Sequence, residues 1–233
     1  MANEKMIITI GREHGTMGEK VADKLRKQFH LPLYDKAHLL KAVEGTEEYD
    51  ELNAFFNDRK VNSLLYAIAM SASVRANDVP FGIIKNIIGD TGGIVMDGCG
   101  NYLFRNRPNT VRIFLHANKD IRINNLVTHL GMTKEQARKE IEAEDSKRYE
   151  FHKYYTEEIW GMSNGYELCL DEGILGIDGC VQMILDYIKI RKQWLLFTAN
   201  YYYFLFSANS LFMLHSGLKI PTFLQYFFVS TTF

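Results

Sequence analysis

Three glycines follow the first apolar run of the chain and precede a helical pattern. Residues 7–10 read Ile-Ile-Thr-Ile, and Gly11, Gly15 and Gly18 come next. A strand, a glycine-rich turn and a helix in this order bring backbone N–H groups and the positive end of the helix dipole to one point, where an anion binds. The spacing therefore predicts a phosphate-binding loop, whose candidate binding residues are Arg12, Gly15, Thr16, Gly18 and Lys20.

This loop lacks the lysine that a Walker A motif supplies to the β- and γ-phosphates. Gly18 stands where that lysine would be. Arg12 or Lys20 could supply the positive charge instead. The alternative is an ordinary tight turn between a strand and a helix, with a solvated lysine at Lys20.

Acidic residues follow two further predicted strands. Asp35 comes directly after residues 31–34, and Asp97 directly after the buried run of residues 94–96. The carboxylate of Asp35 suits a nucleoside hydroxyl, a base amine or Mg²⁺, and Asp97 resembles a carboxylate that holds Mg²⁺ through water. Each of them is also a good residue to cap the helix that follows it.

A third group of candidates is basic and lies near a charged, aromatic stretch over residues 145–158. Lys147 and Arg148 belong to it, and Arg122 lies on the helix predicted over residues 118–130. Basic side chains on a lid stabilise the oxygens of a transferring phosphoryl group. The competing interpretations are a solvated helix face for the charged run and a surface ion pair for Arg122.

The elements that must position these residues alternate between strands and helices up to Lys192. Strands are predicted over residues 7–10, 31–34, 94–96, 111–115 and 166–170, and helices between them, including residues 64–72, 133–143 and 178–190. Such alternation predicts an α/β fold with a mostly parallel central sheet and right-handed crossovers.

Composition excludes several classes of protein. The chain has 233 residues and a net charge of −1, with 27 Lys and Arg against 28 Asp and Glu, so no global field attracts nucleic acid. Three scattered cysteines form neither a disulfide framework nor a zinc spacing, and the histidines show no ligand pattern, so no metal-ligand residues are predicted. Cys169 and Cys180 lie in apolar patterns and are expected to be buried thiols. No signal peptide precedes Met6, which predicts a cytoplasmic location.

The composition changes after Lys192, which divides the chain into a domain over residues 1–192 and an apolar, aromatic-rich tail over residues 193–233. Residues 193–218 carry no charge. The length of this run suits a membrane or interfacial segment, with contact through residues 194–218. Its asparagines, histidine and crowded tyrosines argue against hydrocarbon, and a non-native extension is the third alternative.

Several ordered motifs together resemble the cytidylate kinase-like family. These are Thr9-Ile10-Gly11-Arg12-Glu13-His14-Gly15, Pro32-Leu33-Tyr34-Asp35-Lys36, Arg107-Pro108-Asn109, Tyr154-Tyr155-Thr156 with Trp160-Gly161, and Leu168-Cys169-Leu170-Asp171. The resemblance covers residues 6–192. It departs from the family after residues 94–96, where members carry an arginine in V-G-R-[GC]-A-[DN]-Y and this chain reads Asp97-Gly98-Cys99-Gly100-Asn101-Tyr102.

The resemblance implies a P-loop NTPase-type three-layer fold with a helical acceptor region and a basic lid. It further implies transfer of the γ-phosphoryl group of ATP, with Mg²⁺, to a nucleoside monophosphate such as CMP. In that scheme Arg122, Lys147 and Arg148 act on the transferring group, and Asp35, Lys36 and Asp97 bind the acceptor. The alternative is a catalytically impaired, nucleotide-binding regulatory protein, a pseudo-kinase, since two expected cations are missing.

Overall fold

The computed structural model describes residues 5–57 and 78–216. The described part of Glu4–Gln182 forms one compact unit, and the described part of Met183–Phe233 belongs to a second. The helix predicted over residues 64–72 lies outside the described residues. The candidate site residues all belong to the first unit.

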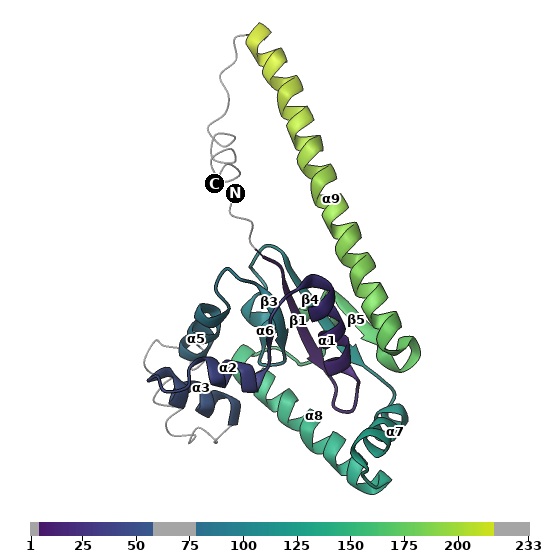
Figure 1. The fold of residues 1–233 in the computed structure, drawn as a ribbon. Helices are drawn as coiled ribbons and strands as arrows, with labels where there is room; N and C mark the ends of the chain where they lie inside the picture. The colour runs from purple at the N-terminus through teal and green to yellow at the C-terminus, as the bar shows by residue number, and fades with distance from the viewer. Residues whose placement is uncertain (1–4, 58–77, 217–233) are drawn as a thin grey trace. The chain divides into compact units, whose positions relative to one another are not determined.

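The described residues of the first unit form a five-stranded, all-parallel sheet in the order β2-β3-β1-β4-β5 (Figure 1). Its strands are β1 (Ile7–Arg12), β2 (Leu33–Tyr34), β3 (Gly93–Met96), β4 (Thr110–His116) and β5 (Leu168–Asp171). The predicted strands are confirmed, although β2 and β5 each begin two residues later than expected. Ile7, Ile8 and Ile10 are fully buried, as expected for a central strand covered on both faces.

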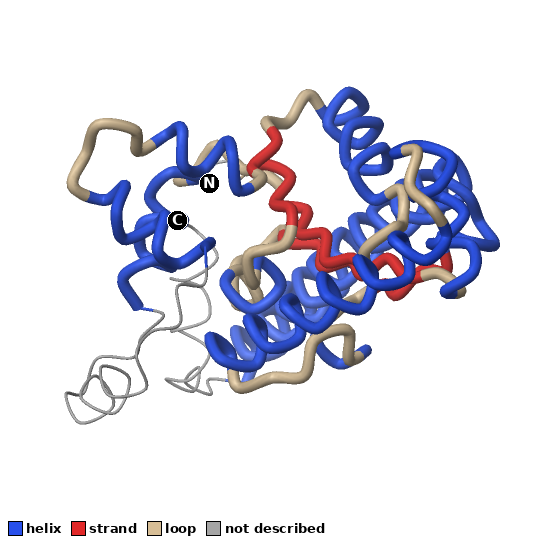
Figure 2. Tube along the Cα trace, turned by 90° about the horizontal axis from the view of Figure 1, so that it is seen from below, coloured by secondary structure: helices blue, strands red, loops and turns tan. Residues whose placement is uncertain are grey.

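Helices connect the strands, as the predicted α/β alternation requires. They are α1 (Gly18–Phe29), α2 (Lys36–Ala42), α3 (Glu48–Asn57), α5 (Asp78–Ile88), α6 (Gly100–Leu103), α7 (Lys119–Leu130), α8 (Lys134–Thr156) and α9 (Glu172–Ser216), with a short 3₁₀ turn at Ser163–Gly165. α1 leads from β1 to β2, whereas α6 leads the opposite way along the sheet, from β3 to β4. Right-handed crossovers in opposite directions place these helices on opposite faces, and Figure 2 shows the strands (red) between helices (blue).

Helix α8 is longer than the sequence pattern predicted, because the charged run after Ala143 continues the helix to Thr156. Its start is a capping box, in which Thr133 and Gln136 bond reciprocally. Near this end Ala137 and Ile141 pack in a small core with α7. At the other end Tyr155 packs in the main core, so α8 runs from α7 across the carboxyl ends of the strands to α3 (Figure 1).

Helix α3 begins at Glu48, within the acidic run that starts at Glu44, because Leu52 and Phe55 supply a buried face. One local expectation is wrong. Cys169 was expected to be buried, but it is exposed, because β5 is the last strand of the sheet, whereas Cys180 is buried as predicted.

Helix α9 continues through the predicted domain boundary at Lys192 to Ser216. A kink at Gly176, whose backbone is non-helical at φ 64° and ψ 179°, separates its first turn from the rest. Within the described part of the chain, no helix combines the length and the apolar character that crossing a membrane requires.

Candidate active site

A cavity of about 860 Å³ opens at the carboxyl ends of β1 and β3. The connections that leave these neighbouring strands run to opposite faces of the sheet, which is the position where open α/β sheets bind ligands. Its lining includes Arg12 at the end of β1 and Asp97 after β3, Asp35 and Lys36 at α2, Phe56 and Asn57 at the end of α3, and Glu144, Lys147, Arg148, Phe151 and His152 on α8.

The inner wall of the cavity carries a cluster of opposite charges around Asp97. Arg12 Nη1 donates to Asp97 Oδ2 at 2.8 Å, and Arg12 Nη2 contacts Glu19 Oε1 at 2.9 Å. Arg148 Nη2 lies 3.7 Å from the same Asp97 oxygen, and its Nη1 donates to the backbone oxygen of Arg12 at 2.9 Å. Two guanidinium groups therefore converge on one carboxylate, although the expected arginine after β3 is missing.

One carboxylate oxygen of Asp97 is unpaired within the described part of the chain. Its Oδ1 is buried and has no hydrogen-bond partner among the described residues. The backbone is also unusual for a non-glycine residue, with φ at +56°, which costs energy and is found where a functional geometry demands it. An oxygen of this kind fits Mg²⁺ or a water on Mg²⁺, but no cluster of three or more metal-ligating side chains occurs among the described residues. Phosphate oxygens would have to supply the remaining ligands.

Asp35 and Lys36 form the α2 side of the cavity. Asp35 is the N-cap of α2, as predicted, and its Oδ1 accepts from the His38 backbone N–H at 2.8 Å. Burial opposes ionisation of Asp35, yet hydrogen bonds from His38 outweigh it and lower the pKa of the carboxyl below its usual value. Lys36 Nζ donates to Asn57 Oδ1 at 2.5 Å, which joins α2 to the end of α3.

Lys147 lies on the outer side of the cavity and pairs with Glu144 at 2.6 Å. The hydrogen bond and the negative charge of Glu144 raise the pKa of the Lys147 ammonium. The lysine is therefore fully protonated at neutral pH. Its exposed side chain is long enough to exchange Glu144 for a phosphate oxygen at little cost, because solvent-exposed ion pairs are weak.

The glycine-rich loop before α1 has the predicted strand–turn–helix form, but carboxylates already bind part of it. The His14 N–H donates to Asp145 Oδ1 at 2.8 Å, and the Met17 N–H donates to Glu172 Oε2 at 3.5 Å. The Thr16 hydroxyl donates to the Glu13 carbonyl at 2.9 Å, within the loop. Two backbone donors that a phosphate could use are thus occupied by acidic side chains.

Two glycines of the loop, Gly15 and Gly18, pack tightly against arginines. A Cβ at Gly15 would lie 2.9 Å from the Arg122 carbonyl oxygen, and Gly15 has φ at +84°. A Cβ at Gly18, the first residue of α1, would lie 2.5 Å from Cδ of Arg12. The absence of a side chain at Gly18 therefore lets Arg12 pass across the start of α1, where the Walker lysine would otherwise stand. Lys20 is exposed, on the first turn of α1.

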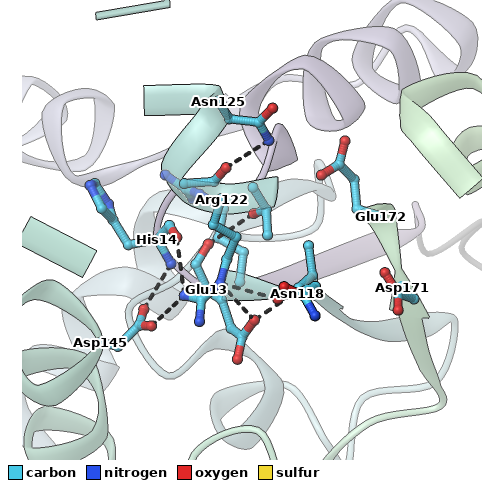
Figure 3. Close-up of polar contacts among 12 residues, drawn as sticks. Glu13, His14, Asn118, Arg122, Asn125, Asp145, Asp171 and Glu172 are labelled. Atoms are coloured by element: carbon cyan, nitrogen blue, oxygen red, sulfur yellow. Dashed lines mark hydrogen bonds and ion pairs between the residues drawn. The ribbon is translucent and has the colours of Figure 1, made fainter. Parts of the chain in front are cut away.

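Arg122 lies behind this loop and does not line the cavity (Figure 3). It is buried, at 7% exposure, and its Nη1 contacts Asp145 Oδ2 at 2.5 Å and the His14 carbonyl at 3.2 Å. Its Nε donates to the Ala117 carbonyl at 3.1 Å and lies 3.3 Å from Glu13 Oε2. Arg122 thus joins the loop to α7 and α8, and its expected action on the transferring group stays a prediction.

Several cavity residues were not among the candidates from the sequence. Asn101 on α6 and His152 on α8 are buried polar residues, and Phe151 and Phe56 supply apolar surface. Trp160 lines the cavity and also packs edge-to-face on Phe114. The i, i+3, i+4 spacing of Arg148, Phe151 and His152 on one continuous helix is the signal that could have revealed them.

Parallel strands, a glycine-rich loop at the start of α1 and a cationic cavity at the carboxyl edge define a P-loop-type α/β protein. Residues 7–174 match the sequence model of the cytidylate kinase-like family, and the chain belongs to this family. The resemblance drawn from the motifs is confirmed.

Solved structures also resemble the chain. A crystal structure of an uncharacterized protein from Eubacterium ventriosum ATCC 27560 is 26% identical, with a TM-score of 0.62 over 79% of this chain and 98% of that one. Shikimate kinase from Bacteroides thetaiotaomicron is 11% identical, with a TM-score of 0.46 over 79% and 98%. Deoxyadenosine kinase from M. mycoides with bound dATP is 10% identical, with a TM-score of 0.40 over 79% and 100%. No curated protein sequence matches the chain.

Proposed function

We propose that this protein is a nucleotide kinase that transfers the γ-phosphoryl group of ATP to a nucleoside monophosphate, with a CMP-like acceptor. The observation that carries the proposal is the convergence of Arg12 and Arg148 on Asp97 inside a cavity at the carboxyl edge of the sheet. Membership of the cytidylate kinase-like family supports the same activity.

In the proposed reaction an oxygen of the acceptor phosphate attacks the γ-phosphorus. The bond between this phosphorus and the β–γ bridging oxygen breaks, and ADP leaves with that electron pair. Negative charge builds on the transferring oxygens, and catalysis depends on neutralising it. Arg12, Lys147 and Arg148 are the cations of the cavity that would do so, as replacements for the missing Walker lysine and the missing arginine after β3.

The remaining residues position the two substrates. We assign the donor phosphates to the start of α1 near Gly15, Thr16, Gly18 and Lys20, where the helix dipole favours an anion. Asp35 and Lys36 lie on the acceptor side of the cavity. Mg²⁺, when bound, would neutralise phosphate charge, with the free Oδ1 of Asp97 as its protein ligand directly or through water.

A coupled assay of ADP formation with CMP, dCMP, UMP and AMP as acceptors tests the proposal. We expect turnover with at least one pyrimidine monophosphate and a loss of about 10²-fold or more in kcat for Arg148→Ala. Lys153→Ala is the matched control, because Lys153 is exposed on the same helix and does not line the cavity. Absence of turnover from folded protein at high concentration contradicts the proposal.

A second function, a nucleotide-binding regulatory protein without transfer activity, is favoured by one observation. The His14 and Met17 amides of the loop are bound by the carboxylates of Asp145 and Glu172. Calorimetry separates the two functions, since binding of ATP or CMP without ADP formation selects the regulatory protein.

A further inference from the structure

The face of α8 that lines the cavity changes character along its length. Glu144, Lys147, Arg148, Phe151 and His152 follow one another at helical spacing and all line the cavity. The first three are charged, and Arg148 contacts Asp97, whereas the last two are an aromatic ring and a buried imidazole. The α8 wall of the cavity therefore has a charged end and a neutral end.

His152 is the polar group of the neutral end. Only 3% of it is exposed, and it lines the cavity. Burial lowers the pKa of the imidazole to about 4, so the ring is neutral at physiological pH. A neutral imidazole offers one N–H donor and one acceptor nitrogen.

Asn101 supplies a second buried polar group on a different wall. It lies on α6, beyond β3, and is 7% exposed. It lines this cavity and also the smaller pocket beside Gly165, and its amide carries two donors and an acceptor. Buried polar groups are nearly always hydrogen-bonded in proteins, so a ligand or water that fills the cavity has both His152 and Asn101 as partners.

Aromatic rings also line the cavity. Phe151, Phe56 and Trp160 line the same cavity, and ring faces of this kind stack on flat heterocycles. A flat ligand that carries both donors and acceptors on its edge would satisfy His152 and Asn101 together. Inorganic phosphate and sugar phosphates have no such edge.

We propose that His152 and Asn101 hold the base of a nucleoside monophosphate by its hydrogen-bonding edge, while Arg12 and Arg148 hold its phosphate. This assignment rests on the proposed nucleotide ligand, but not on phosphoryl transfer. The volume of about 860 Å³ is at the upper end of the range for small-molecule sites and accommodates both halves of such a ligand.

Calorimetric titration with CMP, AMP and ribose 5-phosphate tests the assignment, because ribose 5-phosphate keeps the phosphate and lacks the base. We expect the wild-type protein to bind CMP or AMP at least about tenfold more tightly than ribose 5-phosphate. His152→Phe, which keeps a buried ring and removes both nitrogens, is expected to lose this preference while its affinity for ribose 5-phosphate stays unchanged.

His152→Gln is the conservative variant, because its amide keeps a donor and an acceptor, and it is expected to retain most of the preference. His129→Gln, on the exposed last turn of α7, is the control and is expected to match the wild type. Asn101→Leu provides an independent variant with the same expected loss as His152→Phe.

Three results separate the possibilities. Equal affinity of the wild type for CMP, AMP and ribose 5-phosphate, or no binding of any of them, overturns the assignment. Unchanged base preference in folded His152→Phe and Asn101→Leu also overturns it. If base preference depends on His152 but the protein has no transferase activity, the assignment is supported. The proposed kinase function is then overturned instead.

Discussion

The guanidinium of Arg12 donates to the carboxylate of Asp97 at 2.8 Å and thereby joins the ends of two adjacent strands, β1 and β3. Asp97 holds Arg12 beside the glycine-rich loop, and Arg12 takes the space that Gly18 leaves open. This pair explains how a loop without the Walker lysine still presents a cation.

Replacing Arg12 removes the cation that stands in for the missing Walker lysine. For Arg12→Ala we expect kcat/KM to fall about 10²- to 10³-fold, as for the loss of other donors to a developing charge. Arg12→Lys is expected to restore only part of the activity, because an ammonium group cannot reproduce the planar fork that contacts Asp97 and Glu19 together. Steady-state kinetics measures both. Lys27→Ala, on the exposed side of α1, is the control, and equal activity of Arg12→Ala and this control would contradict the role.

Gly18→Ala tests whether the position of the Arg12 side chain across the start of α1 matters for ligand binding. The new methyl group would stand 2.5 Å from Arg12 Cδ, so the arginine must move, whereas the helical backbone accepts alanine. We expect the melting temperature to be unchanged or slightly higher and CMP affinity to fall, measured by scanning calorimetry and titration. Gly82→Ala in α5 is matched, because a Cβ there meets nothing within 4 Å. Full CMP affinity in Gly18→Ala would show that the position of Arg12 is unimportant.

Arg122→Met tests the buried ion pair behind the loop. The substitution keeps an unbranched side chain but leaves the partly buried Glu13 and Asp145 carboxylates without their partner. Breaking a buried pair from one side costs about 3 kcal/mol, which corresponds to a decrease of roughly 6–12 °C in melting temperature for a chain of this size. Thermal denaturation measures it.

The matched control also joins α7 to α8. Lys119 and Glu142 form an ion pair of the same length, 2.5 Å, but both are exposed. Solvent screens such a pair, so Lys119→Met is expected to change the melting temperature much less. Adding Asp145→Asn to Arg122→Met is expected to recover part of the loss, because it removes one unpaired charge. Equal effects of the two single substitutions would contradict the role of burial.

The buried imidazole of His152 predicts a specific dependence of stability on pH. The folded protein protonates it only near pH 4, whereas the unfolded chain does so near its ordinary pKa of 6.5. Between these values the unfolded state binds more protons, so the free energy of unfolding falls as the pH is lowered from 6.5 to 4, by up to about 3 kcal/mol. Above pH 6.5 the contribution is constant.

Urea denaturation of the wild type and His152→Gln at several pH values between 4 and 7 isolates this contribution. Carboxylates such as Asp35 titrate in both proteins, so their effect cancels in the difference. We expect the wild type to lose stability relative to the variant as the pH falls. Parallel curves would show that His152 is accessible to protons in the folded state.

Local patterns predicted the elements well, because their causes are local. The apolar run of β1, the glycines before α1, the Asp35 cap and the capping box of α8 each depend on residues a few positions apart. The cavity residues Arg12, Asp35, Lys36, Asp97, Lys147 and Arg148 were also among the candidates, because each follows a strand or lies in the basic lid.

What the sequence could not predict depends on distant partners. Arg122 meets Asp145, 23 residues away, and the His14 carbonyl, 108 residues away, and nothing in its own helix distinguishes a buried arginine from a surface one. His152 lies in a highly charged run that reads as solvated, yet it is buried because α8 crosses the carboxyl edge of the sheet. The position of a helix over a sheet is a tertiary property.

Helix α8 is supported at both of its ends, by Ala137 and Ile141 against α7 and by Tyr155 in the main core, with Lys147 and Arg148 on the span between them. The fold therefore fixes the position of this helix before any ligand binds. A flexible lid must lose conformational entropy in every catalytic cycle as it orders over its substrate. A helix that is packed at both ends loses that entropy once, when the chain folds, and its basic side chains are then preorganised for each ligand.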